Sequence, residues 1–182
     1  MTSAADQLSL PGYRAGTWAV DRDRSRVGFA IRQMFTPVRG RFTGYDALIV
    51  TGQRPLESTL DVSIDIASID TGNARRDEHL RRSYLDLTAN PYATYRSGSL
   101  RPTDQGLLVD GVLTLNDVTE PVPLALAPRG FFTDAEGTRA EFAATTRIGR
   151  RDFRVAAPMA AWGAVVSDTI TIDLDIHAVL TG

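Results

Sequence analysis

Apolar and polar residues alternate along most of this chain, which is typical of β-strands that bury one face. From residue 170 to residue 178, every even-numbered position is apolar and every odd-numbered one is Thr, Asp or His. His177 is therefore predicted to be exposed. The segments with this pattern, which we predict to be strands, are 27–31, 38–50, 58–66, 93–100, 107–115, 122–132, 140–148 and 169–179.

About eight strands at short spacing, joined by turns such as 104–106 and 134–137, predict a meandering antiparallel sheet. Strands of this length with one apolar face pack as a sandwich or close into a barrel. An eight-stranded barrel has room inside for side chains or for one small ligand. The sequence thus predicts an all-β protein, with a loosely attached arm at 1–16 and one barrel domain at 17–182.

The segment 74–84 departs from the strand pattern and predicts a short helix. Thr71 or Asn73 can cap its start, and an Asn-Pro pair at 90–91 ends the region. Leu80 and Tyr84 are four residues apart, so they share one face of the helix and can point into the protein. We expect this helix to cover one opening of the barrel.

Composition excludes several kinds of chemistry. The chain has no cysteine and only two histidines, so neither a disulfide framework nor a zinc or iron site is expected. A net charge of −2 gives no reason to expect nucleic-acid binding. All 20 basic residues are arginine, which excludes a catalytic Schiff-base lysine.

The first residues contain neither a basic start nor an apolar run, and no window approaches the ~18 apolar residues of a spanning helix. We therefore expect a cytoplasmic protein without an integral membrane segment.

A set of short motifs lies along the chain in a fixed order. They are WAVD at 18–21, VRGRF at 38–42, SIDTG at 68–72, RDEHL at 76–80, NP at 90–91, GVLTL at 111–115, VTEPV at 118–122, RDF at 151–153 and IHA at 176–178. In this order and spacing, the motifs resemble those of the YceI-like, polyisoprenoid-binding family. The resemblance extends from residue 17 to residue 179.

The resemblance implies a lipocalin-like antiparallel barrel with a helical cover and an elongated apolar tunnel. The family's ligands are long isoprenoid or fatty-amide-like chains, and no general catalytic activity accompanies the family. The implied function is that of a binding or carrier protein for such a chain. Alternation along the strands selects the candidate wall residues, which are Phe29, Ile31, Phe42, Ile64, Ile66, Leu113, Leu115, Phe142, Ile172 and Leu174.

Two further regions are expected to contribute to the cavity. Leu80, Tyr84 and Leu85 from the helix should close one end of the tunnel. The stretch 151–166 is rich in Ala and Pro and predicts an irregular lid that contributes Trp162.

The chain departs from the family pattern at three positions. Arg24 and Gln33 lie where the family often has histidine, and Arg154 lies where it usually has glycine after Arg-Asp-Phe. We expect the bulk of Arg154 and Trp162 to narrow the cavity and to select shorter or differently shaped ligands than a full-length polyprenyl pyrophosphate.

Charged residues of the motifs are candidates for the rim of the tunnel. Arg76, Asp77 and His79, with Arg151 and Arg154, could contact a pyrophosphate or quinone head group. The alternative is a solvated helix face, with Asp77 fastening the helix to the rim through Arg151.

Candidate catalytic residues are absent from the pattern. Ser25 and Ser167 have no histidine nearby in sequence, and nothing in the sequence brings Asp152 and Asp168 together. We expect no catalytic residue, no cofactor and no metal. Two alternatives stay open: a cofactor-independent cyclase or isomerase acting on an apolar substrate in the same cavity, and a structural or partner-binding barrel. A homodimer is compatible with each of these.

Overall fold

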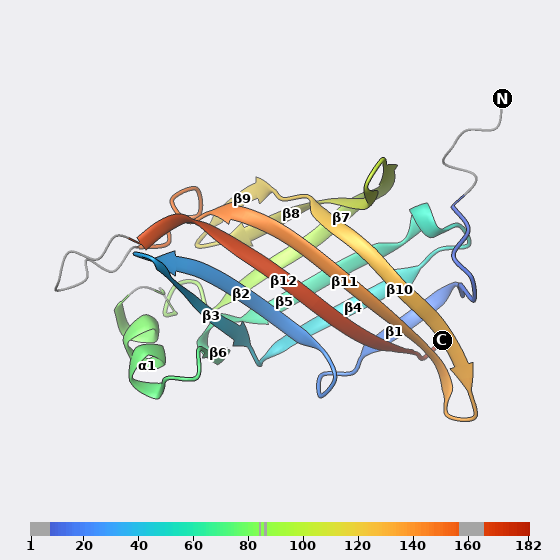
Figure 1. Cartoon of the computed structure of the whole chain (residues 1–182), viewed down its shortest axis with the longest axis horizontal. Coiled ribbons are helices and arrows are strands. Elements are labelled where there is room, and N and C mark those ends of the chain that lie inside the picture. The colour runs from blue at the N-terminus through green and yellow to red at the C-terminus, as the bar shows by residue number, and fades with distance from the viewer. Residues whose placement is uncertain (1–7, 84, 86, 157–165) are drawn as a thin grey trace.

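The computed structural model describes residues 8–83, 85, 87–156 and 166–182. Eight antiparallel strands close into a ring, because β1 pairs with both β4 and β12 (Figure 1). In ring order, these strands are β1 (Gly16–Val20), β4 (Tyr45–Thr51), β5 (Thr59–Asp65), β7 (Tyr92–Thr103), β8 (Gly106–Leu115), β10 (Leu124–Asp134), β11 (Gly137–Gly149) and β12 (Val166–Leu180). The predicted antiparallel barrel is confirmed.

Four further strands extend the wall. β2 (Arg26–Gln33) pairs with residues 166–175 of β12, and β3 (Thr36–Phe42) pairs with β2. β6 (Ile69–Asp70) pairs with β3, and β9 (Val118–Pro121) pairs with β8. The end of β12, residues 178–180, instead pairs with β1, so this one long strand belongs to the wall at both ends of the barrel.

The strand register shows which of the predicted wall residues share a face with one another. Directly opposite residues of an antiparallel pair point to the same face. Ile172 of β12 is opposite Phe29 of β2, and Phe142 of β11 is opposite Ile176. Gly40 of β3 is opposite Phe29, and a β-carbon on Gly40 would lie 2.5 Å from Phe29 Cζ. The glycine in the VRGRF motif therefore makes room for an inward aromatic ring.

The interior holds two clusters of packed side chains. The larger one is built on Tyr95, Val109, Leu113, Val122, Leu124, Ile148 and Phe153. The smaller one is built on Trp18, Ala140 and Ala178, where the ring closes between β1 and β12. Trp18 is 1% exposed, and its Nε1 donates to Thr51 Oγ1 at 2.7 Å.

The helix α1 (Ala74–Ser83) lies at one end of the barrel (Figure 1). Its start agrees with the prediction, because Asn73 Oδ1 accepts a hydrogen bond from Arg76 N at 3.1 Å. The short 3₁₀ turn η3 (Ile66–Ser68) and β6 precede it, and a second 3₁₀ turn, η2 (Pro55–Glu57), joins β4 to β5.

The single strand predicted for 38–50 is wrong, because the structure has β3 and β4 with a break at Thr43 and Gly44. Thr43 N donates to Ser68 O at 3.3 Å, and a β-carbon on Gly44 would lie 3.2 Å from the Ser68 side chain. The chain turns here because the η3 segment packs closely against it, a contact between distant residues that alternation does not reveal.

Candidate functional site

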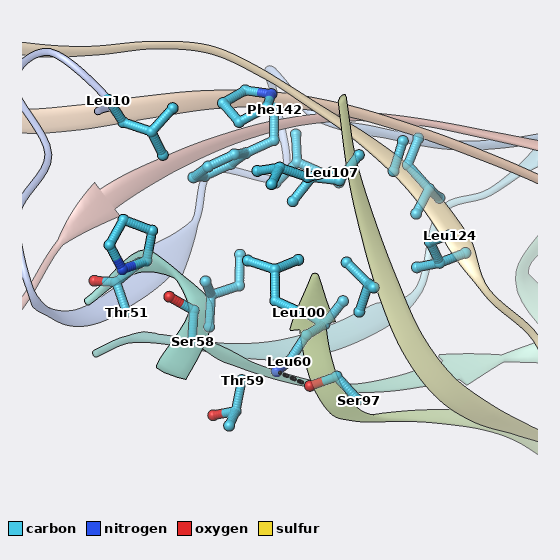
Figure 2. Close-up of a pocket in the computed structure, with 18 of the residues that line it drawn as sticks. Leu10, Thr51, Ser58, Thr59, Leu60, Ser97, Leu100, Leu107, Leu124 and Phe142 are labelled. Carbon is cyan, nitrogen blue, oxygen red and sulfur yellow. Dashed lines mark hydrogen bonds between the residues drawn. The ribbon is translucent and has the colours of Figure 1, made fainter. Parts of the chain in front are cut away.

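A cavity of about 120 Å³ lies inside the ring, and its surface is almost entirely apolar (Figure 2). Its walls come from both packed clusters: Val109 and Leu124 belong to the larger cluster, while Phe131 and Phe142 pack against the smaller one. The cavity therefore lies between the two clusters. The residues around it are Leu10, Tyr13, Ile49, Thr51, Pro55, Ser58, Thr59, Leu60, Ser97, Leu100, Leu107, Val109, Leu124, Leu126, Pro128, Phe131, Phe142, Ala144, Leu174 and Ile176.

The segment before β1 covers the mouth of this cavity. Leu10 and Tyr13 are among its lining residues. The Tyr13 hydroxyl donates to Gly52 O at 2.9 Å and lies 3.1 Å from Ser58 Oγ. The Tyr13 ring meets Phe131 edge-on, with the ring centroids 5.3 Å apart. Residues 10–13 are thus held across the mouth, although no periodicity in the sequence indicated a role for this segment.

Several polar groups at the mouth are already hydrogen-bonded within the protein. Ser97 Oγ accepts from Leu60 N at 2.7 Å, a bond drawn in Figure 2. Thr51 Oγ1 accepts from Trp18 Nε1 at 2.7 Å. Among the residues that the structure describes, no charged side chain lines the cavity. A ligand in this cavity is therefore recognised by shape and apolar contact, without an ionic partner in the wall.

Tyr95 is buried in the larger cluster and is uncharged. Burial raises its pKa to about 12. The neutral hydroxyl donates to Val122 O at 2.9 Å. Tyr95 therefore stays neutral across the ordinary pH range.

The predicted wall residues divide into two groups. Phe142 and Leu174 line the cavity. Leu113, Leu115 and Ile172 belong to the larger cluster or pack against it, and so they fill the barrel beside the cavity. The rings of Phe29 and Phe42 pack against each other, with their centroids 5.4 Å apart. Ile31, Ile64 and Ile66 are buried or half-buried but do not line the cavity.

This packing limits the size of the cavity. Ligand pockets commonly measure ~300–1,000 Å³, and a cavity of ~150 Å³ holds one benzene molecule. The observed cavity of about 120 Å³ is smaller than both. In this conformation, side chains occupy most of the barrel interior, and the space that remains suits only one end of a long chain.

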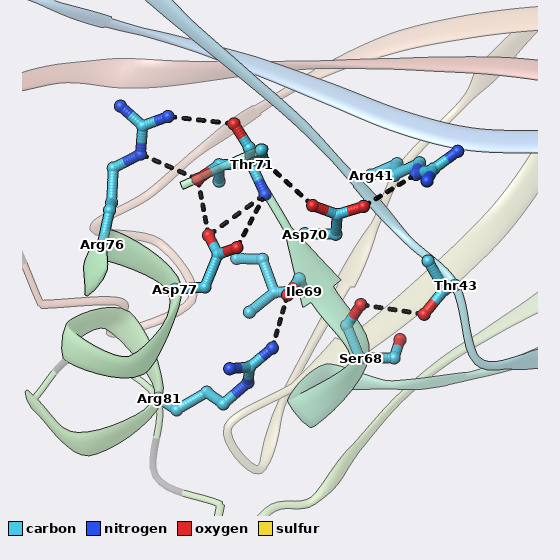
Figure 3. A network of polar contacts seen from close by, with 10 residues as sticks. Arg41, Thr43, Ser68, Ile69, Asp70, Thr71, Arg76, Asp77 and Arg81 are labelled. Carbon is cyan, nitrogen blue, oxygen red and sulfur yellow. Dashed lines mark hydrogen bonds and ion pairs between the residues drawn. The ribbon is translucent and has the colours of Figure 1, made fainter. Parts of the chain in front are cut away.

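Three charged residues of α1, Arg76, Asp77 and Arg81, fasten the helix to the segment before it (Figure 3). Both carboxylate oxygens of the buried Asp77 accept from Thr71 N, at 3.1 and 3.2 Å. Arg76 donates from Nε to Thr71 Oγ1 at 2.8 Å and from Nη2 to Thr71 O at 3.0 Å. His79 is exposed on the helix and Leu80 is half-buried. None of these five helix residues lines the apolar cavity, which lies toward the other end of the barrel.

Asp77 joins the helix to the wall through Thr71 rather than through Arg151. The nearest carboxylate partner of Arg151 is Asp168, at 3.6 Å. Asp152 and Asp168, which the sequence did not connect, both come close to the position that a β-carbon of Gly149 would occupy. They are exposed and outside the cavity lining, so their proximity creates no acid pair in the barrel.

Two predicted residues of the cavity, Tyr84 and Trp162, lie outside the described residues, as does much of the predicted lid. Arg154 is exposed and borders an open, mostly polar hollow beside the end of α1. Arg150, for which the sequence pattern predicts no role, is buried and donates from Nη1 to Val155 O at 2.8 Å. No described residue accepts a hydrogen bond from its Nε. In the sequence, its position directly before the RDF motif is the signal that could have drawn attention to this residue.

Replacing Arg154 with glycine should raise the free energy of unfolding by about 0.5–1 kcal/mol. Arg154 has a φ of 54°, the left-handed conformation that glycine adopts without steric cost. Urea unfolding of the Arg154→Gly protein would measure the gain. Arg154→Ala is the control, because it removes the guanidinium but keeps the β-carbon. An equal gain in both proteins would attribute the effect to charge and contradict the backbone explanation.

Among the described residues, no group of three or more His, Asp or Glu side chains could hold a metal ion. The same residues contain no helix long and apolar enough to cross a membrane.

A family model described as the YceI-like domain matches residues 18–178. A UPF0312 protein of Photorhabdus laumondii is 32% identical over 165 residues, which cover 87% of this chain and 86% of the relative. Protein YceI of Shigella flexneri is 32% identical over 161 residues, which cover 85% of this chain and 84% of the relative. A polyisoprenoid binding domain from Saccharophagus degradans, implicated in plant cell wall breakdown, has a similar fold, with a TM-score of 0.70 and 16% identity over 92% of this chain and 100% of that domain.

Proposed function

The chain belongs to the YceI-like family, and from that premise we propose that it binds a long apolar molecule of the isoprenoid or fatty-chain class inside its barrel. The observation that carries the proposal is the cavity between the two packed clusters. Its lining is almost wholly apolar, and none of the described residues that form it is charged. The domain from Saccharophagus degradans, named for polyisoprenoid binding, has a similar fold. Both support an apolar ligand held without a covalent step.

The segment over the mouth is the part that would move when a ligand enters. Tyr13 is held by one hydrogen bond to Gly52 O and by a hydroxyl contact with Ser58. Two such bonds contribute about 2 kcal/mol together. Burying a five-carbon isoprene unit contributes roughly 4 kcal/mol, at about 0.8 kcal/mol for each carbon. The first unit of a chain thus offsets the loss of these two bonds, and further units offset the loss of the contact between the Tyr13 and Phe131 rings and enter as half-buried side chains repack.

In this proposal the polar end of the ligand stays at the mouth, near Ser58 and Thr59, or in water. The cations predicted from the sequence to meet a head group lie elsewhere: Arg76 bonds to Thr71, and Arg151 faces Asp168. A carrier role for the bound chain, and a cytoplasmic location, stay predictions.

Native mass spectrometry of the freshly purified full chain tests the proposal. We expect a co-purifying lipid, or an increase in melting temperature when a polyprenyl alcohol or a fatty amide is added. At 100 times the dissociation constant, a ligand adds about 2.7 kcal/mol of stability, which corresponds to an increase of roughly 5–10 °C. A protein that purifies empty and shows no increase with either class of compound would rule the proposal out.

A further inference from the structure

The turn between β2 and β3 places two large apolar side chains in water. Phe35 is 94% exposed and Met34 is 59% exposed, the two highest values among the large apolar residues of the described chain. Burying such side chains is favourable, and large apolar residues that remain together on the surface are typical of interaction sites. The pair, which we call the Met34–Phe35 tip, contributes almost nothing to the packing of the barrel.

Met34 has a backbone conformation that is unfavourable for a residue with a side chain. Met34 has a φ of 54°. Two-residue hairpin turns that need a positive φ at this position usually have glycine or asparagine there, because a β-carbon costs energy in that conformation. The turn thus keeps a bulky apolar residue where a small one would be more stable.

The charge around the tip is strongly positive. Residues 26–45 contain Arg26, Arg32, Arg39 and Arg41 and no acidic residue, in a chain whose net charge is −2. Arg41 pairs with Asp70 at 3.1 Å. Arg32 and Arg39 are exposed, and neither forms an ion pair with any described carboxylate. Both lie on the two strands that carry the tip, within four residues of it along the chain.

We propose that the Met34–Phe35 tip docks this protein onto the surface of an anionic lipid bilayer. Phe35 and Met34 insert at the boundary between head groups and acyl chains, and Arg32 and Arg39 attract the anionic head groups. With one small apolar tip and few charges, the attachment is weak, reversible and sensitive to salt. A protein partner for the same tip would have to supply both an apolar socket and acidic groups, whereas an anionic bilayer supplies both at once.

The placement of the tip makes docking separate from cavity binding. Figure 1 shows the β2–β3 turn at the same end of the barrel as α1, while the segment that covers the cavity mouth is at the other end. A docked barrel therefore presents its cavity mouth to water. Docking does not rest on the proposed ligand, and a protein without that ligand can show it.

Co-sedimentation of the full chain with vesicles tests the proposal. We expect binding to vesicles of phosphatidylcholine mixed with phosphatidylglycerol, and little binding to phosphatidylcholine alone. Phe35→Ser should lower the partition coefficient about tenfold, and Arg32→Gln combined with Arg39→Gln by tenfold or more at low salt. Phe132→Ser is the matched control. Phe132 is 49% exposed on β10, near the other end of the barrel, and its replacement should leave the partition coefficient unchanged.

Met34→Gly separates docking from folding. Relief of the positive φ should raise the melting temperature by roughly 2–4 °C, while loss of the side chain weakens vesicle binding. Absence of binding to the anionic vesicles would overturn the proposal, and so would equal binding by the Phe35→Ser and Phe132→Ser proteins. A dimer in solution that Phe35→Ser disperses, without vesicle binding, would overturn it in favour of a contact between two copies of this chain.

Discussion

Replacing Trp18 with alanine should lower the free energy of unfolding by about 3–5 kcal/mol. Trp18 is 1% exposed and lies where β1 closes the ring, opposite Ile49 on β4 and Leu180 on β12. Its indole packs against Ala140 and Ala178, which are also buried. Truncation would leave a cavity where β1 joins both β4 and β12.

The hydrogen bond of Trp18 also contributes to the free energy of unfolding, and a second variant separates this contribution from that of the packing. Nε1 donates to Thr51 Oγ1 at 2.7 Å, and the ring lies edge-on to Phe131 at 5.9 Å. Trp18→Phe keeps an aromatic ring but loses the donor, so it should cost less than Trp18→Ala. Urea unfolding of both proteins measures the difference. A loss for Trp18→Ala no larger than that of the exposed Phe132→Ala would show that the closure does not depend on this residue.

Alternation was sufficient to predict most of the fold, because a strand with one buried face leaves a period of two in the sequence. Ile172 and Phe142 were assigned inward on this basis, and the register of β11 and β12 agrees. The start of α1 was also predictable, since Asn73 caps it through a local hydrogen bond. The break at Gly44 was not, because it results from close packing against Ser68, a residue distant in sequence.

The sequence was sufficient to predict that the cavity is apolar, but not which residues line it. Alternation identifies which side chains point inward, but whether one of them lines a space or fills it depends on what lies across the barrel. Leu113 and Leu174 have the same pattern in the sequence, yet Leu113 is buried in the larger cluster and Leu174 lines the cavity. Leu10 and Tyr13 come from a segment without periodicity, and their role appears only when that segment lies against Phe131.

The motif around α1 shows the same difficulty for charged residues. A short run containing Arg76 and Asp77 is equally compatible with a head-group site and with a structural joint. The structure uses both to bind Thr71, which lies only a few residues earlier in the chain. The sequence shows that Thr71 is near enough to bond to Arg76 and Asp77, but only the fold shows that the three residues are oriented to do so.

Replacing Ala144 with phenylalanine should abolish binding of an apolar chain. Ala144 lies on β11 opposite Leu174 of β12 and Leu126 of β10, and all three line the cavity. Free benzene occupies a cavity of ~150 Å³, so a phenyl ring here would fill the whole of the 120 Å³ present and leave no space for a ligand. We expect the affinity for a polyprenyl alcohol or fatty amide to fall at least a hundredfold, with a stability change below about 3 kcal/mol.

The neighbouring residue provides the matched control. Ala143 is opposite Ala127 and Asp175, which border a groove on the outer surface of the barrel. Ala143→Phe therefore adds the same side chain to the same strand on the other face. Titration of both proteins with one ligand should show loss of binding only for Ala144→Phe. If Ala144→Phe binds normally and Ala143→Phe does not, the ligand occupies the outer groove, and the internal cavity is only an imperfection in the packing between the two clusters.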